Sequence, residues 1–486
     1  MDLNNDNFPL YEAMKDYLEN EYINYHTPGH CQGKFAAEEL KKVLNENTLR
    51  ADLTELPGLD NLYCPGSSIE KSERLAAKVF DADRTKYLVN GASSGIIASM
   101  LYAVEEKEEI LIPRNAHRSV YNGLILTGAL PKYIPLKSQA DGFVLNVDPT
   151  ALEDSLKIGQ EKTLMLTNPT YYGVCLRGIK KLKKNADKNL LMIIDEAHGA
   201  HLNFCKDLID GASKNEADIW IQSIHKNLGS LTQSGLLHWR EDKIDSSKLK
   251  LMLQLNQTTS PSYVLMLSLE FARHNIETNS HLWDDLIDRV QKFRKLIAEE
   301  LDSYQLLELD PESDYVLDLT KLTLFTDKLG VTGYKVAEIL RKEFNILVEL
   351  SSYNHILLFM TPAHDHEAFS HLFYALKEIA KKYKYNGKNL NKVVDNPGIP
   401  EYEISPAVAV KSRYKFLELD KSVGKISGGF ITSYPPGIPL LVPGEKIEGK
   451  TIEYIKDIIS LEGSTLEGVY KNEAQNNNII KIIEAS

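Results

Sequence analysis

The sequence predicts an α/β fold: a large domain with a mainly parallel sheet, then a smaller α/β domain and a C-terminal extension. From Asp52 to about Ile276, short apolar runs alternate with helical patterns. Such runs are typical of strands buried on both faces, and their alternation with helices is typical of a parallel sheet. A similar alternation resumes at Tyr315 and predicts the second domain.

An N-terminal arm is expected over residues 1–50, with a helix around Leu10 to Tyr22 and then a turn-rich stretch. The large domain is expected over residues 51–290. Its predicted strands are Tyr87–Val89, Ile110–Ile112, Thr163–Leu166, Leu190–Ile194 and Ile219–Ile221, and its predicted helices include Ile96–Val104 and His117–Leu126.

A long amphipathic helix near Leu282 to Leu301 is expected to lead into the smaller domain, over residues 291–388. A polar, turn-rich stretch then precedes a C-terminal subdomain over residues 389–486. The alternating segments of the smaller domain are Tyr315–Leu319, Gly333–Phe344, Ile346–Leu350, Ile356–Met360 and Glu367–Lys382.

The composition argues against several classes of protein. The chain has 486 residues, of which 43% are hydrophobic and 26% charged, as in ordinary globular proteins. A net charge of −12 argues against a nucleic-acid partner. No apolar run reaches the roughly 18 residues of a membrane span, and Met1 to Asn7 does not resemble a signal peptide. We therefore expect a cytosolic protein whose four scattered cysteines are reduced.

Asp195 and Lys226 are the strongest candidates for chemistry. Asp195 closes the apolar run Leu190–Ile194, where a carboxylate needs a cationic partner, and Lys226 follows 31 positions later beside His225. Partial burial lowers the pKa of a lysine, which lets its amine attack an aldehyde. Together they suit pyridoxal phosphate (PLP), which needs a lysine tether and a partner for its pyridine nitrogen. The alternatives are a structural ion pair for Asp195 and a solvated surface position for Lys226.

Two further segments lie where predicted strands end. The stretch Asn90–Gly95 presents small and hydroxyl residues between a strand and a helix, as a phosphate site would, although helix capping explains it equally well. His117 follows another strand and is placed to stack on a flat cofactor ring. Taken alone, a capping or core role for His117 is the better interpretation.

Two motif matches point to other functions. Asp195–His198 matches a helicase-type Asp-Glu-Ala-His motif, and Gly444–Thr451 matches the nucleotide-binding pattern GxxxxGK[ST]. The second carries two glutamates that would repel a polyphosphate, and it lies after the first, the reverse of the usual order. An ATPase is therefore the weaker hypothesis. The cluster His26, His30 and Cys31 lacks the spacing of a metal site, and no metal is assigned.

Taken together, the motifs closely resemble those of the bacterial ornithine/lysine/arginine decarboxylases. These have the aspartate aminotransferase fold, PLP fold type I, and the resemblance is to the short form without an N-terminal wing domain. It covers nearly the whole chain. The segments that carry it are 26–30, 52–60, 90–95, 113–119, 168–174, 195–198, 223–233 and 434–439.

The resemblance implies a role for each matching residue. Lys226 would be the Schiff-base lysine, Asp195 the partner of the pyridine nitrogen, His117 the stacking residue and Ala197 the small residue beneath the ring. The phosphate would be held by Ser93, Ser223 and His225. The other residues implied at the cofactor are Ala92, Ser94, His198, Thr259 and Ser260, and those implied at the substrate are Thr170 and Glu445.

Some positions depart from the family pattern. Ala92 stands where threonine is usual, so that Ser94 would have to replace its hydroxyl, and Cys31 stands where lysine is usual. Asn61 and Tyr63 replace an aspartate and a histidine. These changes leave the core chemistry in place and leave the choice of amino acid open.

The resemblance implies PLP-dependent decarboxylation of a basic amino acid, with L-arginine converted to agmatine as the preferred assignment. Lysine and ornithine are the alternatives within the family. Alternatives of another class are a PLP-dependent aminotransferase, a non-catalytic PLP-binding regulator and the ATPase. Because Thr258–Ser260 resembles a stretch that reaches a neighbouring subunit's phosphate site, a homodimer or larger homo-oligomer is expected.

Overall fold

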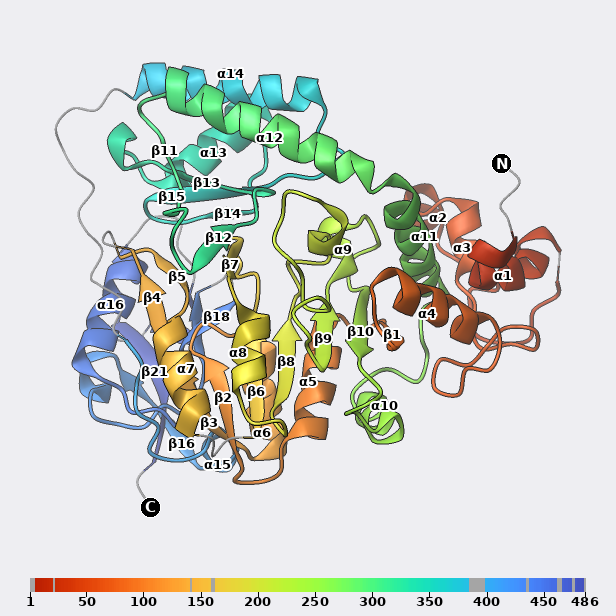
Figure 1. The fold of residues 1–486 in the computed structure, drawn as a ribbon, viewed down its shortest axis with the longest axis horizontal. Helices are drawn as coiled ribbons and strands as arrows, with labels where there is room; N and C mark the ends of the chain where they lie inside the picture. The colour runs from red at the N-terminus through yellow and green to blue at the C-terminus, as the bar shows by residue number, and fades with distance from the viewer. Residues whose placement is uncertain are drawn as a thin grey trace. The chain divides into compact units, whose positions relative to one another are not determined.

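The computed structural model describes residues 5–20, 22–139, 142–158, 162–383, 398–433, 437–460, 466–473 and 477–484. The chain divides into two compact units. Unit 1 comprises residues 1–103, 191–204 and 210–280, and unit 2 comprises residues 104–190, 205–209 and 281–486. Figure 1 traces the chain through the elements of both units. The four-segment division expected from the sequence stays a prediction.

Unit 1 is built on four strands in the order β1-β10-β9-β8. β9 and β8 are parallel, whereas β10 is antiparallel to both β1 and β9. Strands β1, β9 and β8 therefore share one direction, and their C-terminal ends lie along one edge. The bounds are β1 Arg84–Leu88, β8 Leu191–Asp195, β9 Ile219–Gln222 and β10 Gly235–Trp239.

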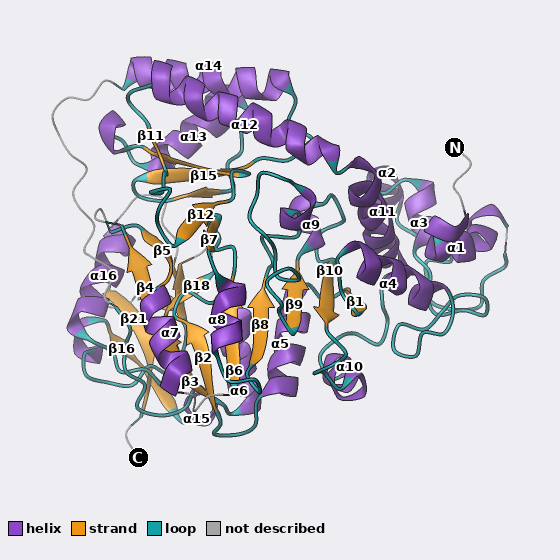
Figure 2. Ribbon diagram, in the orientation of Figure 1, coloured by secondary structure: helices purple, strands orange, loops and turns teal. Residues whose placement is uncertain are grey.

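Helices flank these strands in Figure 2. Helix α5 packs against β9 and β10 and against α10, and α4 packs against β1. The N-terminal helix α1 is joined to α11, because Glu270 of α11 accepts hydrogen bonds from the amides of Leu10 and Tyr11 in α1. The bounds are η1 Asn5–Asn7, α1 Pro9–Glu19, α2 Glu38–Val43, α3 Glu46–Ala51, α4 Ser68–Val79, α5 Ala92–Ala103, η2 Leu202–Phe204, α9 Ile224–Asn227, α10 Ser246–Gln254 and α11 Tyr263–Asn279.

Unit 2 contains three parallel strands in the order β6-β2-β3. The parallel strands of unit 1 and unit 2 together confirm the predicted α/β fold with mainly parallel strands. Helix α6 follows β2, and two short pairs, β4 with β5 and β7 with β12, complete this part. The bounds are β2 Glu109–Pro113, α6 Arg118–Thr127, β3 Leu130–Ile134, β4 Leu136–Ser138, β5 Val144–Val147, α7 Pro149–Ile158, β6 Thr163–Thr167, β7 Val174–Leu176, α8 Ile179–Asn185 and β12 Tyr315–Leu317.

The smaller α/β part of unit 2 has an antiparallel sheet in the order β11-β13-β15-β14. The segment expected over Ile346–Leu350 forms a strand only at its end, where the amide of Glu349 donates to the carbonyl of Leu357 and β14 begins at Leu350. The bounds are α12 His281–Glu300, β11 Gln305–Leu306, β13 Lys321–Phe325, η3 Asp327–Leu329, α13 Gly333–Phe344, β14 Leu350–Ser351, β15 His355–Phe359 and α14 His366–Lys382.

The C-terminal part of unit 2 is rich in short antiparallel strands, in the orders β16-β21-β20 and β18-β17-β19. These strands and α16 share an apolar core that includes Leu441, Ile455 and Ile480. The bounds are α15 Pro406–Lys411, β16 Tyr414–Glu418, η4 Asp420–Ser422, β17 Ile431–Ser433, β18 Ile438–Leu441, α16 Gly449–Ser460, β19 Leu466–Glu467, β20 Val469–Asn472 and β21 Asn477–Ile483.

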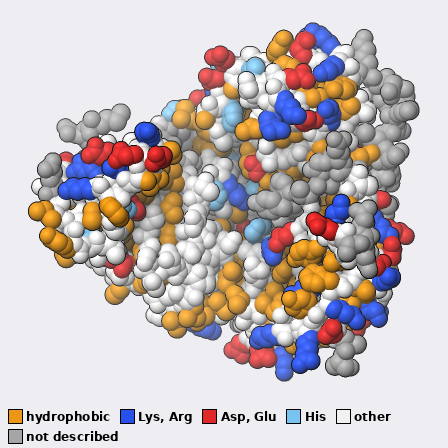
Figure 3. Space-filling view, turned by 180° about the vertical axis from the view of Figure 1, so that it is seen from behind, with side chains coloured by type: hydrophobic (Ala, Val, Ile, Leu, Met, Phe, Trp, Pro, Cys, Tyr) orange, Lys and Arg blue, Asp and Glu red, His pale blue; other side chains and the backbone are white. Residues whose placement is uncertain are grey.

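The surface carries charges of both signs. On the face drawn in Figure 3, Lys and Arg side chains are intermingled with Asp and Glu side chains. Within the described ranges, no helix combines the length and the apolar character that crossing a membrane requires. Nor do the described His, Cys, Asp and Glu side chains form a group of three or more suited to a metal ion.

Candidate active site

Lys226 lies in α9, the short helix that follows β9. The side chain is partly exposed, and its Nζ lies 2.7 Å from Nε2 of His198, which is 7% exposed. His198 follows β8, the parallel neighbour of β9. The structure thus brings together two predicted site residues that are 28 positions apart in the sequence.

Asp195 is the last residue of β8 and is 3% exposed. Its Oδ1 accepts a hydrogen bond from the backbone amide of Ala197, 3.1 Å away, and this bond shapes the turn that leads to His198. Ala197 is itself buried. A buried carboxylate at the end of a central strand favours a cationic partner, which agrees with the role predicted for Asp195.

The predicted phosphate segment lies at the same edge of unit 1, after β1. Helix α5 begins at Ala92, four residues earlier than expected, so Ser93 and Ser94 lie in its first turn. Amides in the first turn of a helix lack intrahelical partners and favour an anion. Ser93 is partly exposed, whereas the buried Ser94 uses its hydroxyl to donate a 2.8 Å bond to the carbonyl of Gly91.

Gly91 and Gly235 allow this tight arrangement. Gly91 has a φ of +77°, a backbone conformation that side chains other than glycine rarely adopt. A Cβ added to Gly235 of β10 would lie 2.8 Å from the carbonyl oxygen of Gln222 and 3.4 Å from the amide nitrogen of Ala92. The close approach of these backbones therefore requires glycine at position 235.

Ser223 and His225 flank the start of α9. Ser223 is 3% exposed, and its side chain makes no capping bond to the helix. Nδ1 of His225 lies 2.9 Å from the carbonyl oxygen of Ser234, so this nitrogen carries the proton that it donates. Burial is the main cause that lowers the pKa of His225, which keeps the imidazole neutral near pH 7.

Thr259 and Ser260 are exposed in the loop between α10 and α11. The loop is fixed to β1 by Gln257, whose Oε1 accepts from the amide of Val89 at 3.0 Å. The exposed position of Thr259 and Ser260 leaves them accessible to a second subunit, as their predicted role requires.

His117 belongs to unit 2, where it is the N-cap of α6. Its Nδ1 accepts from the amide of Ser119 at 3.2 Å and lies 2.8 Å from the Ser119 hydroxyl. The capping interpretation offered by the sequence is therefore confirmed. The cap fixes the ring through Nδ1, and this is compatible with the stacking role, which stays a prediction.

Thr170 and Glu445, the two residues expected at the substrate, also lie in unit 2. Thr170 is buried in the turn before β7, and its hydroxyl accepts from the amide of Val174 at 3.2 Å. Glu445 is 1% exposed; its Oε1 accepts from the Tyr133 hydroxyl, and its Oε2 from Arg114 and the amide of Val442. This environment gives Glu445 an internal partner for each oxygen and offers no support for a substrate role.

Sequence reasoning missed two buried groups near these strand ends. Arg114 is 7% exposed directly after β2, and Glu196 is 1% exposed directly after Asp195. Each charged residue follows an apolar run, which is a signal that the sequence does contain. Burial raises the pKa of Glu196 to about 8, although hydrogen bonds from Gln222 and from the amide of Ala212 oppose this shift.

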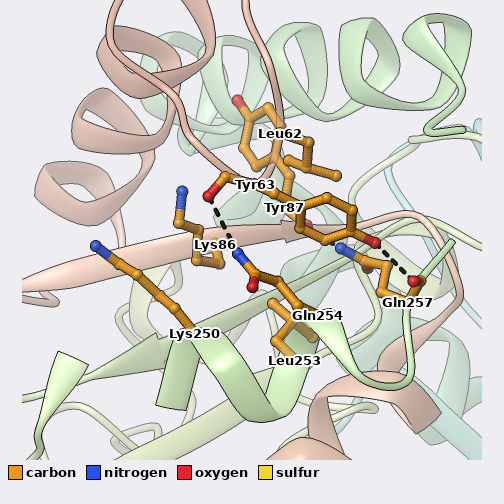
Figure 4. Close-up of a pocket in the computed structure, with 8 residues that line it drawn as sticks. All are labelled: Leu62, Tyr63, Lys86, Tyr87, Lys250, Leu253, Gln254 and Gln257. Atoms are coloured by element: carbon orange, nitrogen blue, oxygen red, sulfur yellow. Dashed lines mark hydrogen bonds between the residues drawn. The ribbon is translucent and has the colours of Figure 1, made fainter. Parts of the chain in front are cut away.

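A small pocket elsewhere in unit 1 is shown in Figure 4, where Gln254 is bonded to the carbonyl oxygen of Tyr63. None of the predicted site residues lines it, so it has no evident part in the predicted chemistry. The lining residues are Leu62, Tyr63, Lys86, Tyr87, Lys250, Leu253, Gln254 and Gln257.

The residues of unit 1 fit PLP by the chemistry of their side chains. The edge formed by β1, β9 and β8 presents an amine at Lys226, a buried carboxylate at Asp195, hydroxyls at Ser93 and Ser223, and the first-turn amides of α5. These are the groups needed to bind an aldehyde, a pyridinium nitrogen and a phosphate.

Comparison with known proteins decides the family. Residues 8–368 match the family model described as "Orn/Lys/Arg decarboxylase, major domain". Residues 389–483 match the family model described as "Orn/Lys/Arg decarboxylase, C-terminal domain". The chain belongs to the Orn/Lys/Arg decarboxylase family. This makes it a PLP-dependent basic amino acid decarboxylase and confirms the resemblance, the enzyme class and the cofactor inferred from the sequence.

Individual members of this family cover most of the chain. The arginine decarboxylase of Bacillus subtilis is 33% identical over 461 residues, which is 92% of each chain. A lysine decarboxylase of Pseudomonas aeruginosa is 23% identical, and the alignment covers 91% of this chain and 74% of that enzyme. The solved structure of lysine decarboxylase A from Pseudomonas aeruginosa, 21% identical, matches with a TM-score of 0.85 over 98% of this chain and 80% of that one, which confirms the fold.

Proposed function

We propose that this decarboxylase acts on L-arginine and releases agmatine and CO2. The observation that carries the choice of arginine is the higher identity to the Bacillus subtilis arginine decarboxylase than to the Pseudomonas aeruginosa lysine decarboxylase, 33% against 23%. Lysine and ornithine are the alternative substrates within the family.

PLP, when bound, supplies an electron sink for the pair of electrons that the departing CO2 leaves behind. In this proposal Asp195 keeps the pyridine nitrogen protonated, because its buried carboxylate favours a neighbouring positive charge. Lys226 would provide the amine that holds the cofactor aldehyde. Ser93, Ser223 and His225 bind the phosphate, with Ala92 and Ser94 beside them.

A proton must return to the α-carbon after CO2 leaves. Lys226 is the proposed donor; the alternative donor, His225, is disfavoured because its Nδ1 proton is bonded to the carbonyl of Ser234. His198 lies within hydrogen-bond distance of the Lys226 amine and is proposed to orient that group. His117 would stack against the cofactor ring, and the small side chain of Ala197 would leave room for it. Loss of CO2 and gain of one proton balance the reaction.

A homodimer is the proposed minimal active unit, with Thr259 and Ser260 of one subunit reaching the phosphate site of the other. We also propose a cytosolic location, which follows from the sequence composition. Gel filtration with light scattering would test the dimer, and a monomeric active enzyme would contradict it.

An activity panel tests the substrate directly. Purified enzyme with PLP is supplied separately with arginine, lysine and ornithine, and the CO2 and the amine product are measured. We expect the highest kcat/KM with arginine, by at least about tenfold, which corresponds to about 1.4 kcal/mol of discrimination. A preference for lysine or ornithine would reject arginine.

The same assays separate the rival classes. An aminotransferase would release a keto acid and no CO2, and a non-catalytic regulator would bind PLP without turnover. An ATPase would be stabilised by nucleotide and would not bind PLP. Each of these results would contradict the proposed reaction.

A further inference from the structure

Two arginines on either side of His117 reach the C-terminal part of unit 2. Arg114 lies three residues before His117 and Arg118 one residue after it. Nη1 of Arg114 donates to the carbonyl of Pro439 at 2.7 Å, and Nη2 donates to the carbonyl of Leu440 at 3.0 Å and to Glu445 at 3.2 Å. These contacts tie the end of β2 to residues more than 300 positions away in the sequence.

Arg118 makes a second, more exposed connection. Its Nη1 lies 2.5 Å from Oε2 of Glu467, and its guanidinium lies 4.7 Å from the centre of the Phe430 ring. The His117 turn is therefore held on both sides by the C-terminal part, through one buried and one partly exposed arginine.

The buried connection is a closed polar cluster. Tyr133 donates its hydroxyl to Oε1 of Glu445, and Tyr121 donates its own to the carbonyl of Arg114. The Arg114 guanidinium lies 5.7 Å from the Tyr121 ring centre and 5.5 Å from that of Tyr133. Removing one member of such a buried pair leaves the other charge without a partner, so the geometry of Arg114 depends on Glu445.

Burial disfavours the charged forms of Arg114 and Glu445, but the opposite charge of each residue favours the charged form of the other. Burial opposes the charge on Arg114, whereas the Glu445 carboxylate raises the pKa of the guanidinium, which stays protonated. Burial also raises the pKa of Glu445, and Arg114 is the largest opposing influence. No substrate is needed to neutralise this pair.

From these contacts we infer that Glu445 and Arg114 are positioning residues for His117, and that the C-terminal part of unit 2 acts as a clamp on the turn that carries it. The clamp fixes the backbone on the N-terminal side of His117, Arg118 fixes it on the C-terminal side, and the bonds from Ser119 to Nδ1 fix the ring. This inference rests on the proposed stacking role of His117 only for its effect on the cofactor.

Hydrogen exchange tests the clamp without reference to turnover. In purified full-length protein, measured with PLP and after its removal, we expect Glu445→Gln to speed exchange of segment 113–120 about tenfold. Segment 222–228, which carries Lys226, should exchange as in the wild type. Asp318→Asn is the matched control, since it breaks another buried pair of unit 2, with Lys321, at 3.4 Å; it should leave segment 113–120 unchanged.

A double-mutant comparison then tests whether the effect passes through His117. We expect Glu445→Gln and His117→Ala each to reduce the visible circular dichroism of bound PLP, and the combined variant to lose no more than His117→Ala alone. Additive losses, or wild-type exchange of segment 113–120 in Glu445→Gln, would overturn the clamp.

A milder variant covers the case in which Glu445→Gln does not fold. Arg118→Gln removes a partly exposed contact, and we expect it to speed exchange of segment 113–120 about threefold. Wild-type exchange in Arg118→Gln would then overturn the clamp. If instead wild-type Lys226 forms no covalent link with PLP, the proposed function fails, while the exchange result on cofactor-free protein still decides the clamp.

Discussion

Nζ of Lys226 and Nε2 of His198 are 2.7 Å apart, so a hydrogen bond joins the residues that follow two parallel strands, β9 and β8. The bond fixes the lysine amine next to the turn formed by Asp195 and Ala197. One local arrangement within unit 1 thus sets the positions of the amine and of the carboxylate that are proposed to hold the cofactor aldehyde and its ring nitrogen.

Replacing His198 tests this arrangement. We expect His198→Ala to slow formation of the Lys226–PLP link about tenfold, because the amine loses a group that orients it. His198→Gln, whose amide can still bond to Nζ, should retain most of the rate. Stopped-flow absorbance after PLP addition measures both, and equal rates for His198→Ala and the wild type would contradict the orienting role.

Replacing Asp195 tests the ring-nitrogen partner. Asp195→Asn keeps the size of the side chain and its bond to the Ala197 amide, but removes the charge. We expect kcat to fall roughly 10²- to 10⁴-fold, while the covalent link at Lys226 persists. Steady-state CO2 release and borohydride trapping measure the two effects, and near-normal kcat would reject the role of Asp195.

Glu196 predicts a pH dependence of stability. Burial raises the pKa of Glu196 to about 8 in the folded protein, whereas its ordinary pKa of 4.5 applies in the unfolded chain. Between pH 4.5 and about 8, the folded protein therefore keeps a proton on Glu196 that the unfolded chain has released. The stability is therefore fully present below pH 4.5, is lost as the pH rises through about 8, and falls by up to about 1.4 kcal/mol per pH unit between them.

Glu196→Gln should remove this contribution and flatten the profile over that window. The free energy of unfolding, measured by urea titration at several pH values, gives the slope. Glu299→Gln, on the exposed surface of α12, is the control and should keep the wild-type profile. An unchanged slope in Glu196→Gln would show that Glu196 does not carry the proton.

Two substitutions separate capping by His117 from its proposed stacking. His117→Asn supplies an oxygen that can cap α6 but has no aromatic ring, whereas His117→Ala has neither. We expect His117→Ala to be less stable than His117→Asn by about 1 kcal/mol, and both to bind PLP more weakly than the wild type. Thermal unfolding and PLP titration measure these effects; full PLP affinity in His117→Asn would remove the stacking role.

The sequence predicted most of the parallel strands because their apolar runs are continuous. It missed the parallel strand β3, Leu130–Ile134, whose apolar residues are interrupted by Pro131 and Lys132. The runs before Asp195 and after Asp218 coincide closely with β8 and β9. Strand β10 was missed, although Gly235–Trp239 is fully buried, because it is the antiparallel member and follows the Lys226 helix after a short loop. The segment expected from Ile346 begins to pair only at Glu349 and Leu350, because the amide of Ile346 is still bonded to the carbonyl of Leu340 in α13.

The positions of Asp195 and Lys226 beside strand ends were predictable because each follows an apolar run. His198 was included only through the family resemblance, and the roles of all three residues stay predictions. Glu445 was placed at the substrate by the family resemblance alone, and the sequence contains no information on the Tyr133 and Arg114 contacts of its buried side chain. Tyr434, Pro435 and Pro436 of the matching segment 434–439 lie outside the described residues.

Peptide mapping after borohydride reduction tests the central claim most directly. The purified enzyme is reconstituted with PLP, reduced and digested, and the peptide that contains Lys226 is examined by mass spectrometry, with Lys226→Ala as the control. We predict one pyridoxyl adduct at Lys226 in the wild type and none in the variant. An adduct at another lysine, or an unmodified Lys226 in protein that releases CO2 from arginine, would contradict the account.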